Sequence, residues 1–224
     1  MTDHQSRDEA ELIRRFRHDA VAAIGQIKAF TQLLGKELGK DASERARLSE
    51  ARIVEATDRL LEQVEALTEL HRGFDSGSRA RVSLEDAARG AVERAKRHFA
   101  DVQAEVTIGA LPRITASPSA VQRLFDELVD NAFKYREGDT VRLDISAEQT
   151  PDGDTVLRVR DDGAGFDADQ CEAVFEPFRR MVPAAHSPGV GVGLAICERI
   201  VEALGGSIRA ESAPGAGTTI TIEW

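Results

Sequence analysis

The sequence has few cysteines and no long apolar segment, whereas cysteines and such segments are features of zinc-binding and membrane-spanning proteins. Its 224 residues include two cysteines, Cys171 and Cys197, and neither has a second cysteine or a histidine at the spacing of a zinc site. We therefore expect no zinc site, and we expect both thiols to pack as small buried side chains in a reducing compartment. No stretch approaches the roughly 18 consecutive apolar residues of a spanning helix, so we predict no direct membrane insertion.

The N-terminus and the net charge exclude further classes. Residues 1–5 are polar and lack the apolar core of a signal peptide. The formal net charge is −10, which disfavours nucleic acid and anionic lipid as main partners. We expect a soluble, cytoplasmic chain, and we expect any sensor part to lie in a separate domain or protein.

Proline is absent from the first 75 residues, and this region has the periodicity of long helices. A break at 39–42 divides it, and Ser43 is placed as the N-cap of a second helix. We therefore predict a helical hairpin over residues 1–75. Apolar residues recur at heptad spacing at Ile13, Phe16, Ala20, Ala23, Ile27, Phe30 and Leu34, and again at Ile53, Thr57, Leu60, Val64 and Leu67.

A single hairpin of this kind would leave both apolar seams half exposed. Two hairpins can close a four-helix bundle, so we predict a homodimer. The alternative is a monomeric hairpin that packs on the second half of the chain. A seam of this length favours a partner of equal length, which is the second hairpin.

The second half of the chain has a different pattern. Glycine and serine around 73–78 indicate a loop, and we place a linker at 76–81 and a second domain at 82–224. The order of the elements predicts an α/β sandwich, which is one mixed sheet with helices on one face. The spacing predicts helices near 84–99, 118–136 and 192–204 and strands near 102–108, 140–147, 155–161, 206–212 and 217–223.

One cluster of polar residues lies on the predicted helix near 118–136. Glu127 and Asn131 are four residues apart and share a face, which can present oxygen atoms to a hard cation such as Mg²⁺. Lys134, one turn further along, can reach a phosphate. A solvated helix face would have the same spacing, so this cluster alone does not decide the function.

Three further clusters lie at the ends of predicted elements. Asp161 ends a strand, where a carboxylate can accept a hydrogen bond from an exocyclic amine, and Gly163 and Gly165 would let the backbone approach a flat ring. The segment 175–180 contains two phenylalanines. The segment 189–194, with its three glycines, opens a helix whose free amides can bind phosphate. Singly, these clusters are also consistent with a simple turn or a flexible loop.

In their order and spacing, the four clusters resemble the ATP-binding domain of the histidine kinase, gyrase, heat-shock chaperone and mismatch-repair ATPase superfamily, over residues 82–224. The resemblance implies a Bergerat-type fold that binds ATP with Mg²⁺. It implies that Asn131 binds Mg²⁺ and that Asp161 reads the adenine amine. The nucleotide-binding residues that it implies are Asn131, Lys134, Tyr135, Asp161, Gly163, Gly165, Phe178, Gly189, Gly191, Gly193, Leu194 and Thr218.

His18 is the candidate phosphoacceptor. The heptad assignment puts it at an outward position, and a neutral imidazole is a nucleophile. Residues 16–24 resemble the dimerisation and phosphotransfer box of histidine kinases, in which the His is followed by an acid, here Asp19. The box usually continues with Leu-Arg, then Thr or Asn, then Pro-Leu, whereas this chain has Ala22 and Ala23 at the last two variable positions.

The resemblance implies a kinase reaction and its partner. ATP would phosphorylate His18, with Asp19 removing or holding the imidazole proton. The phosphoryl group would then pass to an aspartate in the receiver domain of a response regulator. These roles come from the family and are expectations for this chain.

Two alternatives stay open. Most histidine kinases have Asn at the position of Glu127, and the related ATPases have a Glu there that activates water, so an ATPase with Glu127 as general base is one rival. The absence of a transducer domain and the presence of the hairpin argue against it. The other rival is a phosphotransfer or scaffold protein with a decayed ATP site, and the intact glycines and Asn131 argue against decay.

Overall fold

The computed structural model describes residues 3–38, 43–70, 79–151, 153–181 and 190–224. The chain forms two compact units, Met1–Arg72 and Gly73–Trp224, which are described separately. Within the described ranges, no helix is both long enough and apolar enough to cross a bilayer.

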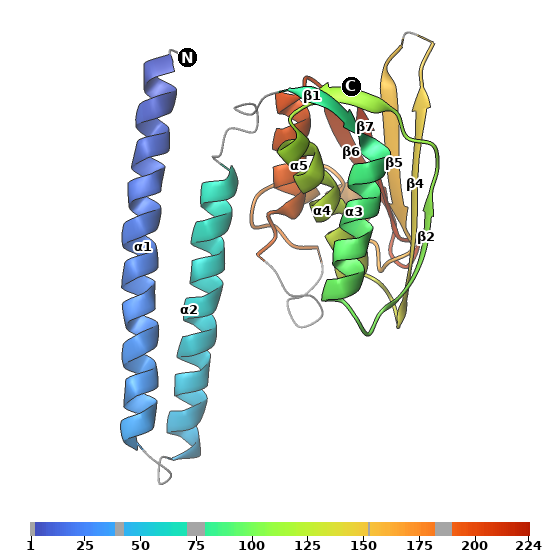
Figure 1. The fold of residues 1–224 in the computed structure, drawn as a ribbon. Coiled ribbons are helices and arrows are strands. Elements are labelled where there is room, and N and C mark those ends of the chain that lie inside the picture. The colour runs from blue at the N-terminus through green and yellow to red at the C-terminus, as the bar shows by residue number, and fades with distance from the viewer. Residues whose placement is uncertain (1–2, 39–42, 71–78, 152, 182–189) are drawn as a thin grey trace. The chain divides into compact units, whose positions relative to one another are not determined.

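The first unit is a hairpin of two long helices, α1 (Asp3–Leu38) and α2 (Glu44–Leu70), as the sequence predicted (Figure 1). The side-chain oxygen of Ser43 accepts a hydrogen bond from the amide of Ala46 at 3.2 Å, which confirms Ser43 as the N-cap of α2. An ion pair between Lys28 and Asp58 joins the two helices.

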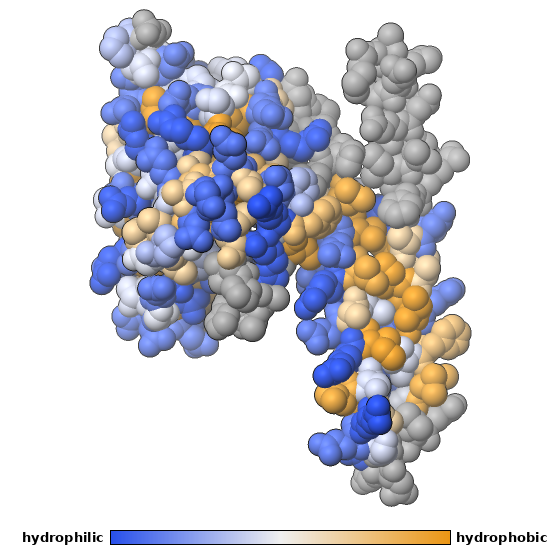
Figure 2. Space-filling view, turned by 180° about the vertical axis from the view of Figure 1, so that it is seen from behind, coloured by the Kyte–Doolittle hydropathy of each residue, from blue (hydrophilic) through white to orange (hydrophobic). Residues whose placement is uncertain are grey.

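The heptad positions of the hairpin are only partly covered by its own two helices. Ile24, which the predicted pattern omitted, is buried, as are Thr57 and Ala66 on α2. The space-filling view shows apolar surface along the hairpin (Figure 2). A single hairpin therefore leaves an apolar stripe uncovered, as we expected from the seams. The exposed large side chains among the predicted seam positions are Ile27, Phe30 and Leu34 on α1 and Ile53 and Leu60 on α2.

The second unit is built on a five-stranded sheet with the strand order β2-β4-β5-β7-β6. The pair β2 and β4 is parallel, and the other neighbouring pairs are antiparallel. The helices α3 (Leu84–His98), α4 (Pro118–Lys134) and α5 (Gly193–Ala203) lie on one face of the sheet (Figure 1). This confirms the predicted α/β sandwich. The strands are β2 (Gln103–Ile108), β4 (Thr140–Gln149), β5 (Thr155–Asp161), β6 (Ser207–Ser212) and β7 (Thr218–Glu223).

The two faces of the sheet differ because side chains alternate along each strand. In β4, Val141, Leu143 and Ile145 are buried against the helices, and the residues between them are exposed. The outer face carries charged side chains in ion pairs that join neighbouring strands, such as Arg158 with Glu148 at 2.7 Å. The core between the layers includes the fully buried side chains of Leu84, Leu124, Phe125, Phe133, Leu157, Ile196, Ile200 and Ile222.

The sequence did not predict the two-stranded antiparallel sheet of β1 (Ala80–Ser83) and β3 (Arg113–Ala116). As a result, Ala80 and Arg81, which we expected in the linker 76–81, belong to a strand of the second unit. A four-residue strand is too short to show a period, and its partner lies beyond a helix and another strand. The predicted domain boundary at residue 75 falls outside the described residues. Two short 3-10 helices, η1 (Ala168–Gln170) and η2 (Ala173–Phe175), also have no counterpart in the prediction.

Candidate functional site

A pocket in the second unit is lined by residues of α4, β5, α5, β7 and the segments that follow β5. Its apolar wall includes Leu128, Val159 and Ile220. Such a pocket, apolar with a few polar groups, is typical of a small-molecule site. It brings together eight residues that the sequence predicted: Asn131, Tyr135, Asp161, Gly165, Gly191, Gly193, Leu194 and Thr218.

Asp161 is the last residue of β5, and its carboxylate lies in the pocket wall. Its Oδ1 accepts hydrogen bonds from the amides of Gly163 at 2.9 Å and Thr218 at 3.2 Å. Burial raises the pKa of the Asp161 carboxyl above its ordinary value, although the two amide hydrogen bonds oppose the rise. The carboxylate is therefore held in a fixed orientation between the loop after β5 and the start of β7.

The two glycines after Asp161 are required by the protein's own backbone. A Cβ atom at Gly163 would lie 2.6 Å from the carbonyl oxygen of Tyr135, and one at Gly165 would overlap the carbonyl oxygen of Ala213. The amide of Ala164 donates to the same Tyr135 oxygen at 2.9 Å. We expected these glycines to admit a flat ring. The structure adds another reason, which is the close approach of the loop to the end of α4 at Gly163 and to the segment between β6 and β7 at Gly165.

Helix α4 directs two side chains toward the start of α5. Asn131 lines the pocket. Glu127 forms an ion pair through Oε1 with the Nη2 atom of Arg123 at 2.6 Å, and a Cβ atom at Gly193 would lie 2.6 Å from its Oε2. The Glu127 carboxylate thus packs against the first residue of α5.

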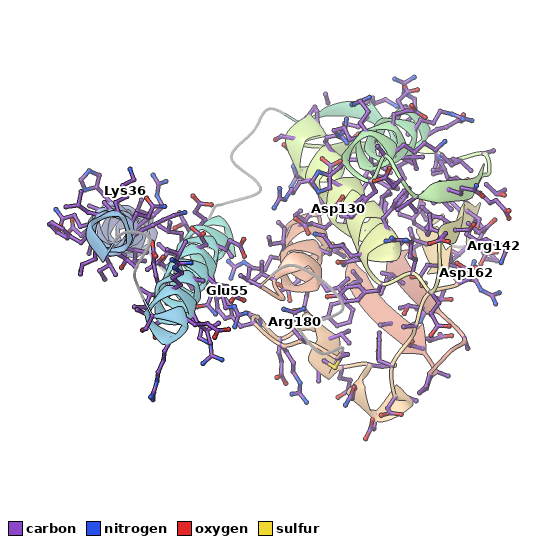
Figure 3. All side chains as sticks on the ribbon, turned by 90° about the horizontal axis from the view of Figure 1, so that it is seen from below. Lys36, Glu55, Asp130, Arg142, Asp162 and Arg180 are labelled. Carbon is purple, nitrogen blue, oxygen red and sulfur yellow. The ribbon has the colours of Figure 1, made fainter. Side chains whose placement is uncertain are left out.

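Lys134 is not among the residues that line the pocket. Its Nζ atom lies 3.2 Å from the Oδ2 atom of Asp130, one turn back on α4. The cationic side chains that do line the pocket are Arg179 and Arg180, which the sequence analysis did not single out. The Nη1 atom of Arg179 pairs with Oε2 of Glu176 at 2.7 Å, and Arg180 is labelled in Figure 3. Their signal was present as two consecutive arginines, but the segment 175–180 drew notice for its phenylalanines.

The segment before α5 is linked to the segment after η2. The amide of Phe178 donates to the carbonyl oxygen of Gly191 at 2.8 Å. Phe178 has a φ of 65°, which is unusual for a residue with a side chain, and Gly191 has a φ of 76°. Phe178 itself is 40% exposed and does not line the pocket. Gly189, another predicted site residue, lies outside the described residues.

His18 and Asp19 lie in the other unit, on α1. Each side chain is 83% exposed, and the Nδ1 atom of His18 is 3.3 Å from the Oδ1 atom of Asp19. The exposure agrees with the outward position that the heptad assignment gave to His18.

The fit of a divalent cation to the pocket depends on the oxygen ligands that the lining residues offer. Within the described part of the chain, no three His, Cys, Asp or Glu residues come together as a set of metal ligands. Mg²⁺ commonly keeps several waters and takes one or two protein oxygens together with substrate phosphates. The amide oxygen of Asn131 fits that role, so the residues present suit Mg²⁺ that arrives with a nucleotide.

The part of the chain that contains the pocket is similar to a known protein family. Residues 116–224 match the family described as histidine kinase-, DNA gyrase B-, and HSP90-like ATPase. The chain is 33% identical over 186 residues to the methanogenesis regulatory histidine kinase FilI of Methanothrix harundinacea, which covers 80% of this chain and 20% of that protein. By these similarities the chain resembles the catalytic core of a sensor histidine kinase.

Solved structures of histidine kinases have the same fold. The mycobacterial sensor histidine kinase MprB matches with a TM-score of 0.56 at 28% identity, over 65% of this chain and 95% of that one. Full-length ShkA matches with a TM-score of 0.66 at 23% identity, over 95% of this chain and 45% of that one. The chain spans between 15% and 37% of the lengths of the first three curated relatives that it matches.

The match of residues 116–224 to this ATPase family implies ATP binding by the second unit. All the residues that line the pocket lie within the matched range 116–224.

Proposed function

We propose that this chain is the catalytic core of a protein histidine kinase that binds Mg-ATP in the pocket and phosphorylates its own His18. The observation that carries the proposal is the convergence of Asn131, Asp161, Gly193 and Thr218 on one pocket from four separate segments. The pocket combines an apolar wall, a buried carboxylate and the start of a helix, which suit a purine, its exocyclic amine and its phosphates.

Asp161 is the proposed adenine contact. Its carboxylate is already oriented by two amides at Oδ1, so it presents an acceptor to the amine of adenine without further ordering. Guanine has a carbonyl oxygen at the corresponding position, and two acceptors facing each other leave a buried polar group unpaired. We therefore expect the pocket to prefer ATP to GTP.

The phosphates are proposed to extend toward the start of α5. Gly191 and Gly193 leave room there, and the first amides of α5 favour an anion. Arg180 supplies positive charge from the opposite segment, beside Arg179, which is paired with Glu176. The predicted contact of Lys134 with the phosphates stays a prediction. Asn131 would hold Mg²⁺, which when bound offsets charge on the phosphates.

His18 is the proposed nucleophile. Asp19 lies beside Nδ1 and would accept a hydrogen bond from the Nδ1–H tautomer, in which the lone pair of Nε2 is directed outward. We propose that Nε2 attacks the γ-phosphorus in line. The new P–N bond forms as the bond to the bridging oxygen breaks, ADP leaves, and the Nδ1 proton passes to Asp19.

The hairpin is proposed to pair with a second copy of itself in a homodimer. The uncovered stripe that includes Ile27, Phe30 and Leu60 is the surface that a four-helix bundle would bury. The exposed His18 would then serve a receiver domain of a response regulator, which takes the phosphoryl group on an aspartate. We infer a cytoplasmic location for this reaction, with the sensor in a separate domain or protein.

Glu127 is the residue on which the rival function, ATP hydrolysis, depends. Its carboxylate is paired with Arg123 and packed against Gly193, which favours a role in holding the start of α5. A water-activating base would instead need its carboxylate directed at the attacking water.

The test is incubation with γ-labelled ATP and mapping of the label. We expect an acid-labile, base-stable label on His18 in wild-type protein and none in His18→Ala, with ATP affinity unchanged because the pocket lies in the other unit. His98→Ala is the matched control, since His98 is exposed on α3 in the ATP-binding unit. Label that persists in His18→Ala would reject His18, and release of free phosphate without any label would favour the ATPase.

A further inference from the structure

The ladder between β4 and β5 ends in an unusual way at the residue after Asp161. Leu143 pairs with Asp161 in the sheet register, so the next pair is Arg142 with Asp162. The amide of Asp162 donates to the carbonyl oxygen of Arg142 at 3.2 Å, as in a regular ladder. The amide of Arg142, however, donates to the side-chain Oδ1 of Asp162 at 2.8 Å. The Asp162 side chain thus replaces the backbone acceptor, and the chain is able to turn away into the glycine loop.

The same carboxylate also binds the Arg142 side chain. Nη1 of Arg142 donates to Oδ2 of Asp162 at 3.2 Å, and its Nε donates to Oε2 of Glu105 on β2 at 2.8 Å. Figure 3 shows Arg142 and Asp162 together at the edge of the domain, apart from Arg180 in the pocket lining. Arg142, on β4, therefore links the residue after β5 to β2, which lies on the other side of β4.

Asp161 and Asp162 are held by different neighbours because consecutive side chains of a strand point to opposite faces. Asp161 points into the pocket and is bound by the amide of Thr218 at the start of β7. Asp162 points to the outer side and is bound by Arg142 of β4. The strand end that presents the pocket carboxylate is thus held from both sides, although neither Arg142 nor Asp162 lines the pocket.

We propose that Arg142 and Asp162 are positioning residues for adenine recognition: they clamp the end of β5 from the outer face and so fix the place of the Asp161 carboxylate. The inference rests on the proposed function, in which Asp161 binds the adenine amine. Arg142 is 64% and Asp162 38% exposed, so the pair itself contributes little to the stability of the fold. The pair acts instead on the position of the Asp161 carboxylate. A carboxylate that is already ordered loses little conformational entropy when it binds adenine.

The test compares ATP and GTP affinities of three variants. Asp162→Ala removes both the acceptor for the Arg142 amide and the ion pair, so we expect a loss of ATP affinity of about tenfold. Arg142→Ala removes the side-chain ion pairs with Asp162 and Glu105 but keeps the hydrogen bond from its own amide to Asp162, and we expect a loss of about threefold. Asp162→Asn keeps an oxygen for the Arg142 amide and should resemble Arg142→Ala. In all three, the preference for ATP over GTP should fall, because a loosened Asp161 discriminates less between an amine and a carbonyl.

Arg158→Ala is the matched control. Arg158 makes an ion pair from β5 to Glu148 of β4 on the same outer face, at 2.7 Å, but toward the other end of the strand pair. It should lower neither ATP affinity nor the ATP preference. Melting temperatures distinguish the clamp from a purely structural role. If the role were purely structural, the variants would have a lower melting temperature and an unchanged ratio of ATP to GTP affinity.

The outcomes separate the clamp from the proposed function. Wild-type ATP and GTP affinities in Asp162→Ala and Arg142→Ala, together with loss of ATP binding in Asp161→Ala, would overturn the clamp alone. Failure of the wild-type protein to bind ATP would overturn the proposed function. If Asp162→Ala does not fold, Arg142→Ala and Asp162→Asn carry the comparison.

Discussion

Large apolar side chains are distributed differently in the two units of this chain. In the described part of the second unit, Phe178 is the one exposed large apolar side chain, and the others are buried or partly buried. A sheet with a helical layer closes its own core, whereas each helix of a two-helix hairpin has a single neighbour. We therefore expect the second unit to fold by itself and the hairpin to be completed by a partner. On the hairpin the exposed large apolar residues are Ile27, Phe30, Leu33, Leu34, Leu48, Ile53 and Leu60.

A charged residue on the exposed apolar stripe should disrupt the hairpin and leave the second unit unaffected. In Ile27→Glu a carboxylate would be buried without a partner when two hairpins meet, which costs several kcal/mol. We expect light scattering to show a dimer for the wild type at micromolar concentration and a monomer, or an unfolded hairpin, for the variant. ATP affinity should stay at the wild-type value. Gln26→Glu, at an exposed neighbouring position, is the control, and a monomeric wild type would contradict the four-helix bundle.

In the second unit, two glycines with nearly the same backbone conformation test how tightly the end of β5 is packed. Gly217 has a φ of 78° and Gly138 a φ of 77°, so alanine at either position costs about 1 to 2 kcal/mol of conformational strain. A methyl group at 217 would also overlap the carbonyl oxygen of Asp161, whereas nothing lies within 4 Å at 138. Gly217→Ala should therefore lower the melting temperature further than Gly138→Ala and also weaken ATP binding. Similar melting temperatures for the two variants would mean that the strand end at Asp161 yields easily.

Acidification should affect the pocket and leave the hairpin dimer unchanged. Burial raises the pKa of Asp161, so its carboxylate takes up a proton at a higher pH than an exposed aspartate does. The protonated group no longer offers an ionised acceptor to adenine, so ATP affinity should fall as the pH falls through this raised pKa. Calorimetric titrations of wild type and Asp161→Asn across this range isolate the contribution of Asp161. A wild-type affinity that follows the variant at every pH would remove Asp161 from adenine binding.

The sequence predicted the long elements well because their signals are repetitive. The helices and strands of the five-stranded sheet lie within two residues of the predicted bounds, since each has a clear helical or alternating period. The strands β1 and β3 have four residues each and pair with each other, so neither carries a local signal. Ile24 was missed for a related reason, because the apolar pattern of α1 does not reveal which stripe contacts α2 and which remains exposed.

The sequence indicated which segments form the candidate site, because glycines and the ends of elements mark them. It indicated less well which side chains of those segments line the pocket, because that depends on their orientation. Asn131 and Asp161 reach the same pocket, as their spacing to the glycine segments suggested. Lys134 stands one turn from Asn131 in sequence, yet its amine pairs with Asp130 on the same helix. Arg180 lines the pocket because the segment after η2 passes along it, which no periodicity indicates. The packing of the glycine loop against Tyr135 is also a contact between distant segments that a single sequence does not reveal.

The order of the strands has a consequence for the way the second unit acquires its pocket during folding. The pairs β4–β5 and β6–β7 join strands that are neighbours in the sequence, and such contacts form early because little chain entropy is lost. The pairing of β5 with β7 is different, since Arg160 meets Thr219 only after the whole intervening segment has been enclosed. That segment contains the loop after Asp161, the start of α5 and both pocket arginines. We infer that the strand pairs β4–β5 and β6–β7 form first. The pocket then assembles in the slower step in which β5 pairs with β7.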